Sequence, residues 1–477
     1  MQHEEYESLD GLALAQRLAS GETTSEALMR CAVELARSRA PALNALCYEQ
    51  YEATIELAKA WRSRGAFGGI PFLLKDSGLP SRRFPSSLGS RLLNDTTYDI
   101  DSTLTRRFDE AGLIPFARST VPEFCMVATT EAVRNGGPTR NPWDLTRSAG
   151  GSSGGAAAAV AARIVPIAHG SDGGGSIRIP AACCGVYGLK ASRGRVPMGP
   201  LRGEGWGGMA TDGVLSLTVR DTAAAMDAIS GYEAGAPYAA PPKAGPYLEA
   251  IARAPARPLR IAVWRSAWND IPVAAEPLQA VDHTADLLRA LGHTVIDSAP
   301  PAIDYDGFVN AHARILASNI VLYVDARVAL TGRSLQADDL EPVMRSGYEF
   351  GRGLMATDYV ASINRLHAIS RAMEAYMEDF DLVLAPALTE LPLKLGELSM
   401  QRGTFMDLRK RVSRYATFMA VFNASGQPAA SLPLYATPEG VPVATQLIGR
   451  FGREDLILQV SAQLESADPW RDRKPAF

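Results

Sequence analysis

The chain has 477 residues, of which 47% are hydrophobic and 21% are charged, and its formal net charge is -4. This composition is ordinary for a globular protein and provides enough apolar material for a buried core. The charge shows no basic excess and no run of more than three Lys and Arg occurs, so we do not expect nucleic acid as a partner. No stretch of about 18 uncharged apolar residues is present, and the start, MQHEEYESLD, is acidic where a signal peptide is basic. We therefore expect a cytoplasmic protein with no membrane association.

The cysteines give no sign of a disulfide framework or a metal site, because their number is odd and no CxxC spacing occurs. We predict reduced, buried thiols at Cys31, Cys47, Cys125, Cys183 and Cys184. The adjacent pair Cys183 and Cys184 is expected to pack in a strand rather than to supply a nucleophile.

The first third of the chain reads as helical and then reaches a buried strand. Thr23 and Glu26 form a capping-box pattern before a helix over ALMRCAVELARSR, and a second helix is predicted for Tyr51 to Arg64. The segment GAFGGIPFLLKDSG then predicts a glycine-rich loop and an apolar strand. Lys75 is the first charge after the apolar run of Ile70 to Leu74.

The second half predicts a sheet with crossover helices. Residues Ser230 to Pro258, rich in Ala, Pro and Gly, are expected to form a surface connection. LRIAVWR, EPLQAVDHTADLLRALGH and TVIDSAP then predict a strand, a helix and a strand on a parallel or mixed sheet. Long helices are predicted around Phe308 to Ala329 and Tyr359 to Phe380, followed by a central strand in DLVLAPAL. AASLPLYATPEGVPVATQLIGR predicts two strands joined by a turn, and a last helix is predicted for Glu454 to Glu465.

Two loops of glycine and serine stand out between these regions. The first runs from Gly150 to Gly155 and leads into an Ala-rich helix predicted for Ala156 to Ala162, and the second runs from Gly173 to Ser176. Glycine lets several backbone N–H groups converge on one point, as a phosphate or an oxyanion requires. The first loop lacks the Gly-Lys-Ser/Thr ending of a P-loop. The sequence therefore favours a nucleophilic serine over a phosphate-binding or nucleotide-binding site.

A histidine base for such a serine is not apparent. Only His169 lies near the loops, and its apolar, Ala-rich surroundings are typical of a core histidine with satisfied hydrogen bonds. No two of the histidines have the spacing of metal ligands; they are His3, His169, His283, His293, His312 and His367. A different base is implied.

Three segments resemble the amidase signature family: GIPFLLKD, GPTRNPWDLTRSAGGSSGG and SDGGGSIRIPAACCGVYGLK. They occur in the order of that family, with Ser152 and Ser176 24 positions apart, and FNASGQPAASLPL and GVPVATQLIGRFG resemble its C-terminal part. The resemblance implies an α/β fold with a mixed β-sheet core covered by helices on both faces. It also implies one domain over residues 1–477, comprising N-terminal helices (1–66), a catalytic core (67–230), a variable pocket region (231–420) and C-terminal strands with a helix (421–477).

The family's chemistry implies specific roles for residues of this chain. Ser176 would be the nucleophile, Ser152 the relay after a cis peptide bond, and Lys75 the base, with no metal and no organic cofactor. The oxyanion hole would consist of the N–H groups of Gly173, Gly174, Gly175 and Ser176. Structural support would come from Gly151, Asp172 and Arg178, the last two as an ion pair.

Lys75 can act as a base only if its amine is neutral. An ordinary lysine has a pKa near 10.4 and is protonated at pH 7, so burial must lower the pKa of Lys75. The apolar run before Lys75 is consistent with such burial.

The substrate is less well defined by the sequence. Within the family, SDGGGSIRIPAACCGVYGLKASRGRVPMGP and AQLESADPWRDRKP are most similar to the branch of 6-aminohexanoate cyclic dimer hydrolases and related bacterial amidases. Linear, cyclic and aryl amides, carbamates (urethanes) and esters all share the expected chemistry. The sequence departs from the commonest family pattern at Ala132-Val133 and Ala191-Ser192, which bears on specificity rather than on the triad. We predict a pocket lined by Cys125, Met126 and Trp206.

Alternatives to a free-standing amidase stay open at this point. A glutamine amidase subunit of an amidotransferase would share the triad but pass ammonia to a partner subunit. A non-catalytic binding protein would keep the fold without the reaction. The sequence also leaves a homodimer open.

Overall fold

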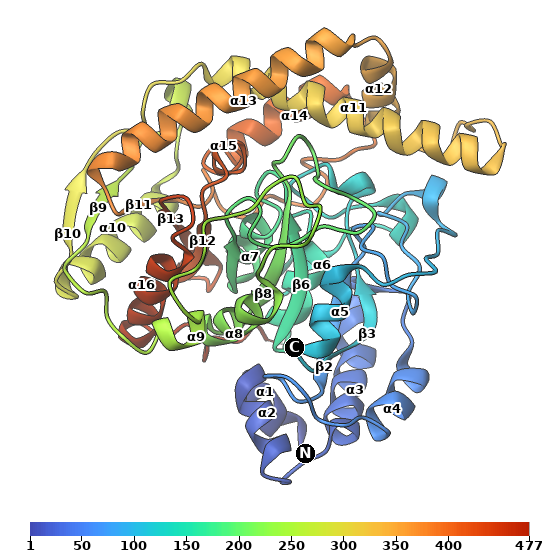
Figure 1. Ribbon diagram of the computed structural model, residues 1–477, viewed down its shortest axis with the longest axis vertical. Helices are drawn as coiled ribbons and strands as arrows, with labels where there is room; N and C mark the ends of the chain where they lie inside the picture. The colour runs from blue at the N-terminus through green and yellow to red at the C-terminus, as the bar shows by residue number, and fades with distance from the viewer. Residues whose placement is uncertain (477) are drawn as a thin grey trace.

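A computed structural model describes residues 1–476 and is organised around one large mixed sheet (Figure 1). Eight strands follow the order β10-β9-β11-β13-β12-β7-β8-β6; β9 is parallel to β10 and β11, and the other pairs are antiparallel. These strands are β6 (Ile167–Asp172), β7 (Tyr187–Lys190), β8 (Thr211–Ser216), β9 (Arg260–Val263), β10 (Thr294–Asp297), β11 (Leu382–Pro386), β12 (Ala429–Ala436) and β13 (Pro442–Gly449).

Two smaller sheets accompany the large one. The first has the order β1-β3-β2, and the second is the pair β4-β5. Their strands are β1 (Leu46–Cys47), β2 (Ile70–Lys75), β3 (Leu113–Ser119), β4 (Arg140–Asn141) and β5 (Asp144–Ser148).

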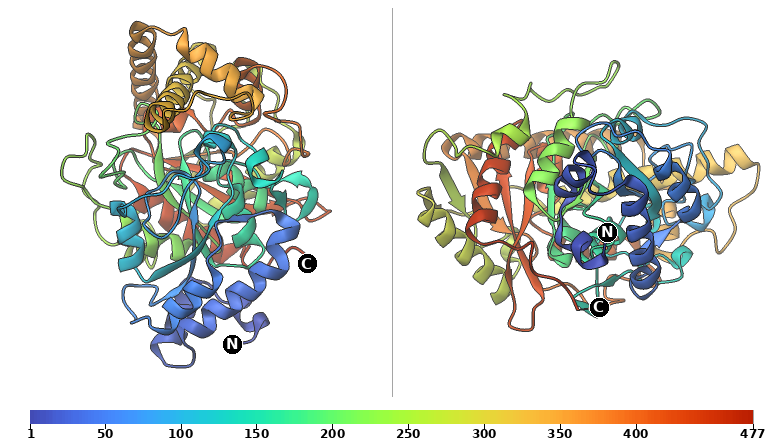
Figure 2. Two further views of the ribbon diagram at one scale, coloured as in Figure 1. Left: turned by 90° about the vertical axis from the view of Figure 1, so that its right-hand side faces the viewer. Right: turned by 90° about the horizontal axis from the view of Figure 1, so that it is seen from below.

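The helices surround these sheets and form groups at opposite ends of the molecule. In Figure 1 the group α11 to α14 lies at the top and α1 to α4 lie at the bottom, and Figure 2 shows the same separation from the side. The α-helices are α1 (His3–Ser8), α2 (Gly11–Ala19), α3 (Ser25–Leu43), α4 (Tyr51–Lys59), α5 (Thr103–Glu110), α6 (Gly154–Ala161), α7 (Arg178–Cys184), α8 (Val219–Ile229), α9 (Tyr247–Ala250), α10 (Ala275–Ala290), α11 (Tyr305–Thr331), α12 (Pro342–Arg352), α13 (Ala356–Tyr376), α14 (Phe405–Tyr415), α15 (Val421–Ser425) and α16 (Glu454–Ala467). Short 3-10 turns are η1 (Arg91–Leu93), η2 (Glu123–Cys125), η3 (Val133–Asn135), η4 (Trp268–Asp270) and η5 (Met377–Asp379).

Helices cover both faces of the large sheet, as predicted. Neighbouring residues of a strand point to opposite faces, and the neighbours Thr445 and Gln446 of β13 contact different helices. Thr445 Oγ1 lies 3.2 Å from Thr284 Oγ1 of α10, whereas Gln446 Oε1 accepts from Arg178 of α7 at 2.7 Å. The sheet is therefore the middle of three layers, and β13 is buried over its whole length. None of the helices of residues 1–476 is long and apolar enough to span a membrane.

The N-terminal helices differ from the prediction at their ends. The side chain that caps α3 is Thr24, which accepts from the N–H of Ala27, rather than Thr23. The capping-box pattern favoured Thr23 because Glu26 follows it three residues later, whereas the observed cap Thr24 is followed at that spacing by Ala27. The helix α4 ends at Lys59 and not at Arg64. The chain turns there because Trp61 packs over Gly69, where a Cβ atom would lie only 2.5 Å from the indole Cδ1.

The predicted elements of the second half are present, and one local prediction is wrong. β9, α10 and β10 form the expected parallel crossover unit, and β12 and β13 form the expected antiparallel pair. The connection 230–258 is largely exposed but includes the short helix α9. Cys183 and Cys184 end helix α7 instead of lying in a strand. Both are buried there, since the chain turns into β7 only after Gly185, which has a φ of 69°.

Candidate active site

Three separate segments bring Ser152 and Ser176 to one cleft and the buried Lys75 against Ser152. Lys75 is the last residue of β2, Ser152 lies in the loop between β5 and α6, and Ser176 lies in the loop between β6 and α7. The two loops are bonded to each other, since the N–H of Ser153 donates to the carbonyl of Ser176 at 3.2 Å. Ser152 and Ser176 line the same cleft, whose free volume is about 500 Å³ including the solvent at its mouth. The two glycine-serine motifs thus meet in space.

His169 joins the small sheet to the large one at this point. Its Nδ1 accepts from the backbone N–H of Lys75 at 3.1 Å, and its Nε2 lies 3.1 Å from Asp212 Oδ1. Because Nδ1 accepts, the proton of the neutral ring is on Nε2 and faces Asp212. Burial lowers the pKa of His169, although Asp212 opposes the shift. The prediction of a core histidine with satisfied hydrogen bonds is confirmed, and this residue helps to position β2.

Lys75 is fully buried, and its amine has three polar neighbours. Its Nζ lies 2.8 Å from Ser152 Oγ, 2.9 Å from Ser171 Oγ and 3.2 Å from the carbonyl oxygen of Ser171. Burial lowers the pKa of Lys75 from that of an ordinary lysine, and the more distant acidic groups only partly offset it. Ser171 was not predicted as a site residue. Its place two residues before a glycine-rich loop, near the end of a buried strand, was the only available signal.

The peptide bond between Gly151 and Ser152 is cis, as the resemblance implied. Gly151 must be a glycine for a further reason, since a Cβ atom there would lie 2.4 Å from the carbonyl oxygen of Thr129. The carbonyl of Gly150 accepts from Thr130 Oγ1 at 2.9 Å. This close packing fixes the loop that carries Ser152.

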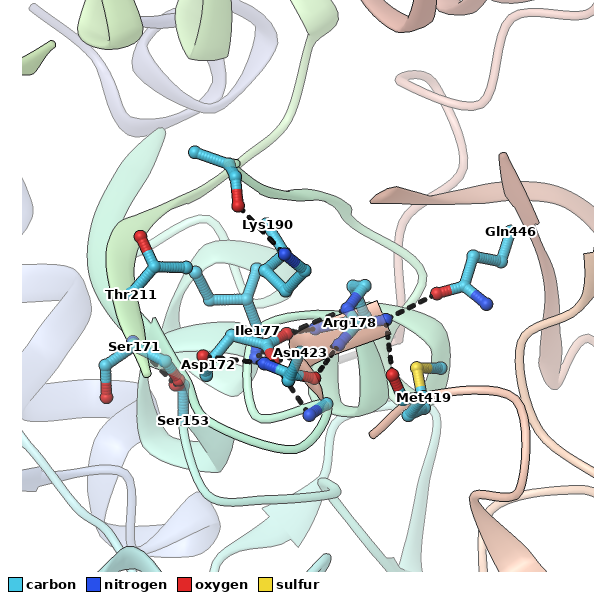
Figure 3. A network of polar contacts seen from close by, with 12 residues as sticks. Ser153, Ser171, Asp172, Ile177, Arg178, Lys190, Thr211, Met419, Asn423 and Gln446 are labelled. Carbon is cyan, nitrogen blue, oxygen red and sulfur yellow. Dashed lines mark hydrogen bonds and ion pairs between the residues drawn. The ribbon is translucent and has the colours of Figure 1, made fainter. Parts of the chain in front are cut away.

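A buried ion pair shapes the loop that carries Ser176 (Figure 3). The Asp172 carboxylate accepts from Arg178 Nε and Nη2, both at 2.9 Å, and from the N–H groups of Gly175 and Ile177 at 2.7 and 3.2 Å. Burial alone would raise the pKa of Asp172, but Arg178 outweighs that effect and holds the pKa well below its usual range. The expected ion pair is present. The N–H of Gly175 is used inside the loop, which takes it out of the predicted set of oxyanion donors.

The other three N–H groups of the predicted set have no acceptor within residues 1–476: those of Gly173, Gly174 and Ser176. Backbone N–H groups without a partner beside a buried serine provide a ready site for an oxyanion.

Two residues missed from the sequence complete the network around the ion pair, as Figure 3 shows. Asn423 Oδ1 accepts from Arg178 Nη2 at 2.6 Å, and its Nδ2 donates to the carbonyl of Asp172 at 3.0 Å. Gln446 Oε1 accepts from Arg178 Nη1 at 2.7 Å. Both amides stand within apolar segments, FMAVFNASG and VPVATQLIG, and a lone polar residue in a buried strand or helix was the signal that could have found them.

The predicted pocket residues line the cleft on both sides of Ser176. Cys125 and Trp206 line both halves, and Met126 lines the second half, whose free volume is about 310 Å³ including open solvent. The Trp206 ring covers Gly173, since a Cβ atom on that glycine would lie 2.3 Å from Trp206 Cε3. Burial raises the pKa of the Cys125 thiol, so it is a neutral wall of the cleft and not a thiolate.

Comparison with known proteins agrees with this geometry. The model of the Amidase family matches residues 27–458. The 6-aminohexanoate-cyclic-dimer hydrolase of Paenarthrobacter ureafaciens is 36% identical over 487 aligned positions, covering 98% of this chain and 96% of that protein. A putative amidase, AmiC, of Mycobacterium tuberculosis is 34% identical over 97% of this chain and 95% of its own length.

Solved structures give the same result. The structure of a 6-aminohexanoate cyclic dimer hydrolase is 32% identical, with a TM-score of 0.93, over 98% of this chain and 99% of that one. A bacterial aryl acylamidase of the amidase signature family is 26% identical, with a TM-score of 0.88, over 97% of this chain and 98% of that one. The chain therefore belongs to the amidase signature family and is a hydrolase of amide carbon–nitrogen bonds.

Proposed function

We propose that the chain hydrolyses small amides through an acyl-enzyme on Ser176, with Ser152 as the proton relay and Lys75 as the base. One observation carries this proposal: Lys75 Nζ lies 2.8 Å from Ser152 Oγ in a fully buried position. A lysine that burial keeps neutral has a lone pair and can accept a proton, which an ammonium group cannot.

The three contacts of Lys75 Nζ fit a neutral amine. The carbonyl of Ser171 can only accept, so one N–H of Lys75 donates to it and the other donates to Ser171 Oγ. The lone pair then faces the hydroxyl of Ser152. As Ser176 Oγ attacks the amide carbon, its proton passes to Ser152, and the proton of Ser152 passes to Lys75.

The developing oxyanion would be held by the three N–H groups that lack an acceptor in the described chain, those of Gly173, Gly174 and Ser176. The proton on Lys75 then returns through Ser152 to the amide nitrogen, the C–N bond breaks and the amine leaves. Water attacks the acyl-enzyme by the same proton path, which releases the carboxylic acid and restores Ser176.

The relatives suggest the range of substrates. Their names point to cyclic dimers of 6-aminohexanoate and to aryl acylamides. We propose small cyclic, linear and aryl amides for this chain, contacted by Cys125, Met126 and Trp206. Carbamates and esters pass through the same tetrahedral intermediate and belong in the same substrate panel.

The test is aniline release from a panel of acyl anilides and aryl carbamates. Ser176→Ala and Ser152→Ala are expected to lower kcat by about 10⁴-fold or more, as for other serine hydrolases. Ser38→Ala, an exposed serine on α3, serves as the matched control. Undiminished release by Ser176→Ala would refute the nucleophile. If the native chain releases no aniline, the glutamine amidase subunit and the non-catalytic binding protein become the better proposals.

We also propose one domain and a cytoplasmic location, and a homodimer stays open. The large sheet takes strands from residues 67–230, 231–420 and 421–477, which supports a single folding unit. The five cysteines are free, buried thiols, as predicted, which suits a reducing compartment. Light scattering coupled to gel filtration measures the oligomeric state.

A further inference from the structure

The second half of the cleft contains a buried arginine without a counter-ion. Arg409, on α14, is only 7% exposed, and within residues 1–476 no carboxylate lies within ion-pair distance of its guanidinium. Its Nη1 donates to the carbonyl of Met126 at 3.0 Å, and its Nε has no acceptor in that part of the chain. Burial lowers the pKa of Arg409 to about 10, so the side chain is still a cation at neutral pH.

Two other buried arginines show how this fold usually treats such a group. Arg178 is paired with Asp172. Arg118 donates to three carbonyl groups, those of Lys75, Leu79 and Phe84. Arg409 has one carbonyl partner instead of three or a carboxylate, which leaves most of its donors available to a ligand.

A second unpartnered donor lines the same part of the cleft. His312, on α11, is 4% exposed, and its Nε2 has no hydrogen-bond partner among the described residues. Its ring lies against the nucleophile loop, since a Cβ atom on Gly174 would be 3.2 Å from His312 Cε1. Burial, with a smaller effect of the charge on Arg409, lowers the pKa of His312 well below its usual value. The neutral ring can donate from Nε2 without adding a second charge.

The remaining walls of this half are apolar. Between the two polar side chains and Ser176 the lining consists largely of aliphatic and sulfur-containing side chains: Met126, Val127, Ile179, Leu316 and Val412. A ligand that fills this space therefore has an aliphatic body and, at the end that meets Arg409, a group that accepts hydrogen bonds and carries negative charge.

We infer that Arg409 and His312 bind a carboxylate of the substrate, so that the enzyme acts on amides whose scissile carbonyl is joined to a carboxylate by a short aliphatic chain. This inference rests on the proposed amidase function and narrows its substrate class. A buried cation is strongly destabilising without a partner, and a substrate carboxylate would supply that partner during binding.

The test compares matched pairs of anilides that differ only in the terminal carboxylate. Succinic, glutaric and adipic monoanilides are paired with butyric, pentanoic and hexanoic anilides, and aniline release gives kcat/KM for each. The readout is the ratio within a pair, which cancels any loss of activity common to both substrates. In the native enzyme the acid of the best-fitting pair is expected to be favoured by about 10- to 100-fold, mainly through KM, as a charge-assisted contact requires.

Variants then locate the preference. Arg409→Met is expected to reduce the ratio to about one, and Arg409→Lys to retain part of it because the positive charge is kept. His312→Gln, which keeps a donor near the same place, is expected to retain more of the ratio than His312→Leu. Arg414→Met is the control, because Arg414 is exposed on the same helix. Thermal unfolding shows which variants are folded, and Arg409→Gln replaces Arg409→Met if the latter is not.

A ratio near one in the native enzyme for every pair, or a ratio that survives in Arg409→Met, would overturn the inference. Failure of the proposed function is distinguishable, because then neither member of any pair is hydrolysed. In that case titration calorimetry with adipic monoanilide decides. Binding to the native chain that is lost in Arg409→Met supports the carboxylate site, and no binding to the native chain overturns it.

Discussion

Replacing Gly173 with alanine tests whether Trp206 fixes the nucleophile loop against the cleft. The new Cβ atom would lie 2.3 Å from Cε3 and 2.5 Å from Cζ3 of the indole ring. Carbon atoms in contact are about 3.5 to 4.0 Å apart, so the loop or the ring must move by roughly 1 Å. The φ of Gly173 is not positive, so alanine adds a steric clash without backbone strain.

The size of the effect follows from that displacement. A shift of about 1 Å in the reacting geometry costs about 100-fold in rate, and overpacking a filled site costs about 1 to 3 kcal/mol of unfolding free energy. We therefore expect Gly173→Ala to lower kcat/KM for a good anilide about 100-fold. In a Trp206→Ala background the ring is gone, and the same change is expected to cost less than about threefold.

The assay is aniline release by the native enzyme, the two single variants and the double variant, with urea unfolding of each. Gly245→Ala is the matched control, because a Cβ atom there meets no other atom within 4 Å. An equal loss from Gly173→Ala with and without the indole ring would refute the steric reasoning.

Three further predictions concern charge. First, kcat/KM is expected to rise with pH through an acid limb whose pKa lies below the ordinary lysine value, because protonated Lys75 cannot accept a proton; Lys75→Arg should be inactive across the whole pH profile. Second, burial raises the pKa of Glu123 to about 8. The protonated Glu123 therefore contributes its full stability below pH 4.5, and this contribution is lost as the pH rises through about 8. Urea unfolding should show Glu123→Gln gaining stability relative to the native chain between pH 5 and pH 8. Third, Asp172→Asn leaves the buried charge of Arg178 unpaired and should lower the unfolding free energy by about 3 to 5 kcal/mol, part of which Arg178→Met in the same chain should restore.

Sequence reasoning identified the site residues that have a recognisable pattern in the residues next to them in the chain. Ser152 and Ser176 each lie in a glycine-rich loop beside a predicted helix, and Lys75 ends an apolar strand, so each has a local signature. The alternation of strand and helix after residue 258 likewise predicted the parallel unit of β9 and β10. These features depend on the periodicity and turn chemistry of short segments.

The residues that sequence reasoning missed reach the site from far along the chain. Asn423 and Gln446 contact Arg178 because α15 and β13 pack beside α7, and His312 and Arg409 reach Ser176 from helices α11 and α14. Asn423 and Gln446 each stand alone among apolar residues, whereas Arg409 lies beside the charged residues Lys410 and Arg411, so no single sequence pattern identifies all of these side chains. Only the register of the large sheet and the packing of distant helices reveal which polar side chains face the cleft.

Three residues at the cleft have unusual backbone conformations that help to determine its shape. The φ angles of Phe124, Cys125 and Trp206 are 53°, 60° and 55°, which are values that non-glycine residues seldom adopt. Such conformations cost of order 1 to 3 kcal/mol each and persist only where the surrounding structure holds them. Here the N–H of Phe124 donates to the carbonyl of Leu88 at 2.8 Å, which fixes the turn. The same turn presents the Cys125 side chain to the cleft and leads into Met126, whose carbonyl accepts from Arg409. One turn thus carries both the Cys125 wall beside Ser176 and the Met126 carbonyl that holds Arg409. A substitution that loosens this turn should therefore alter substrate preference before it alters proton transfer to Lys75.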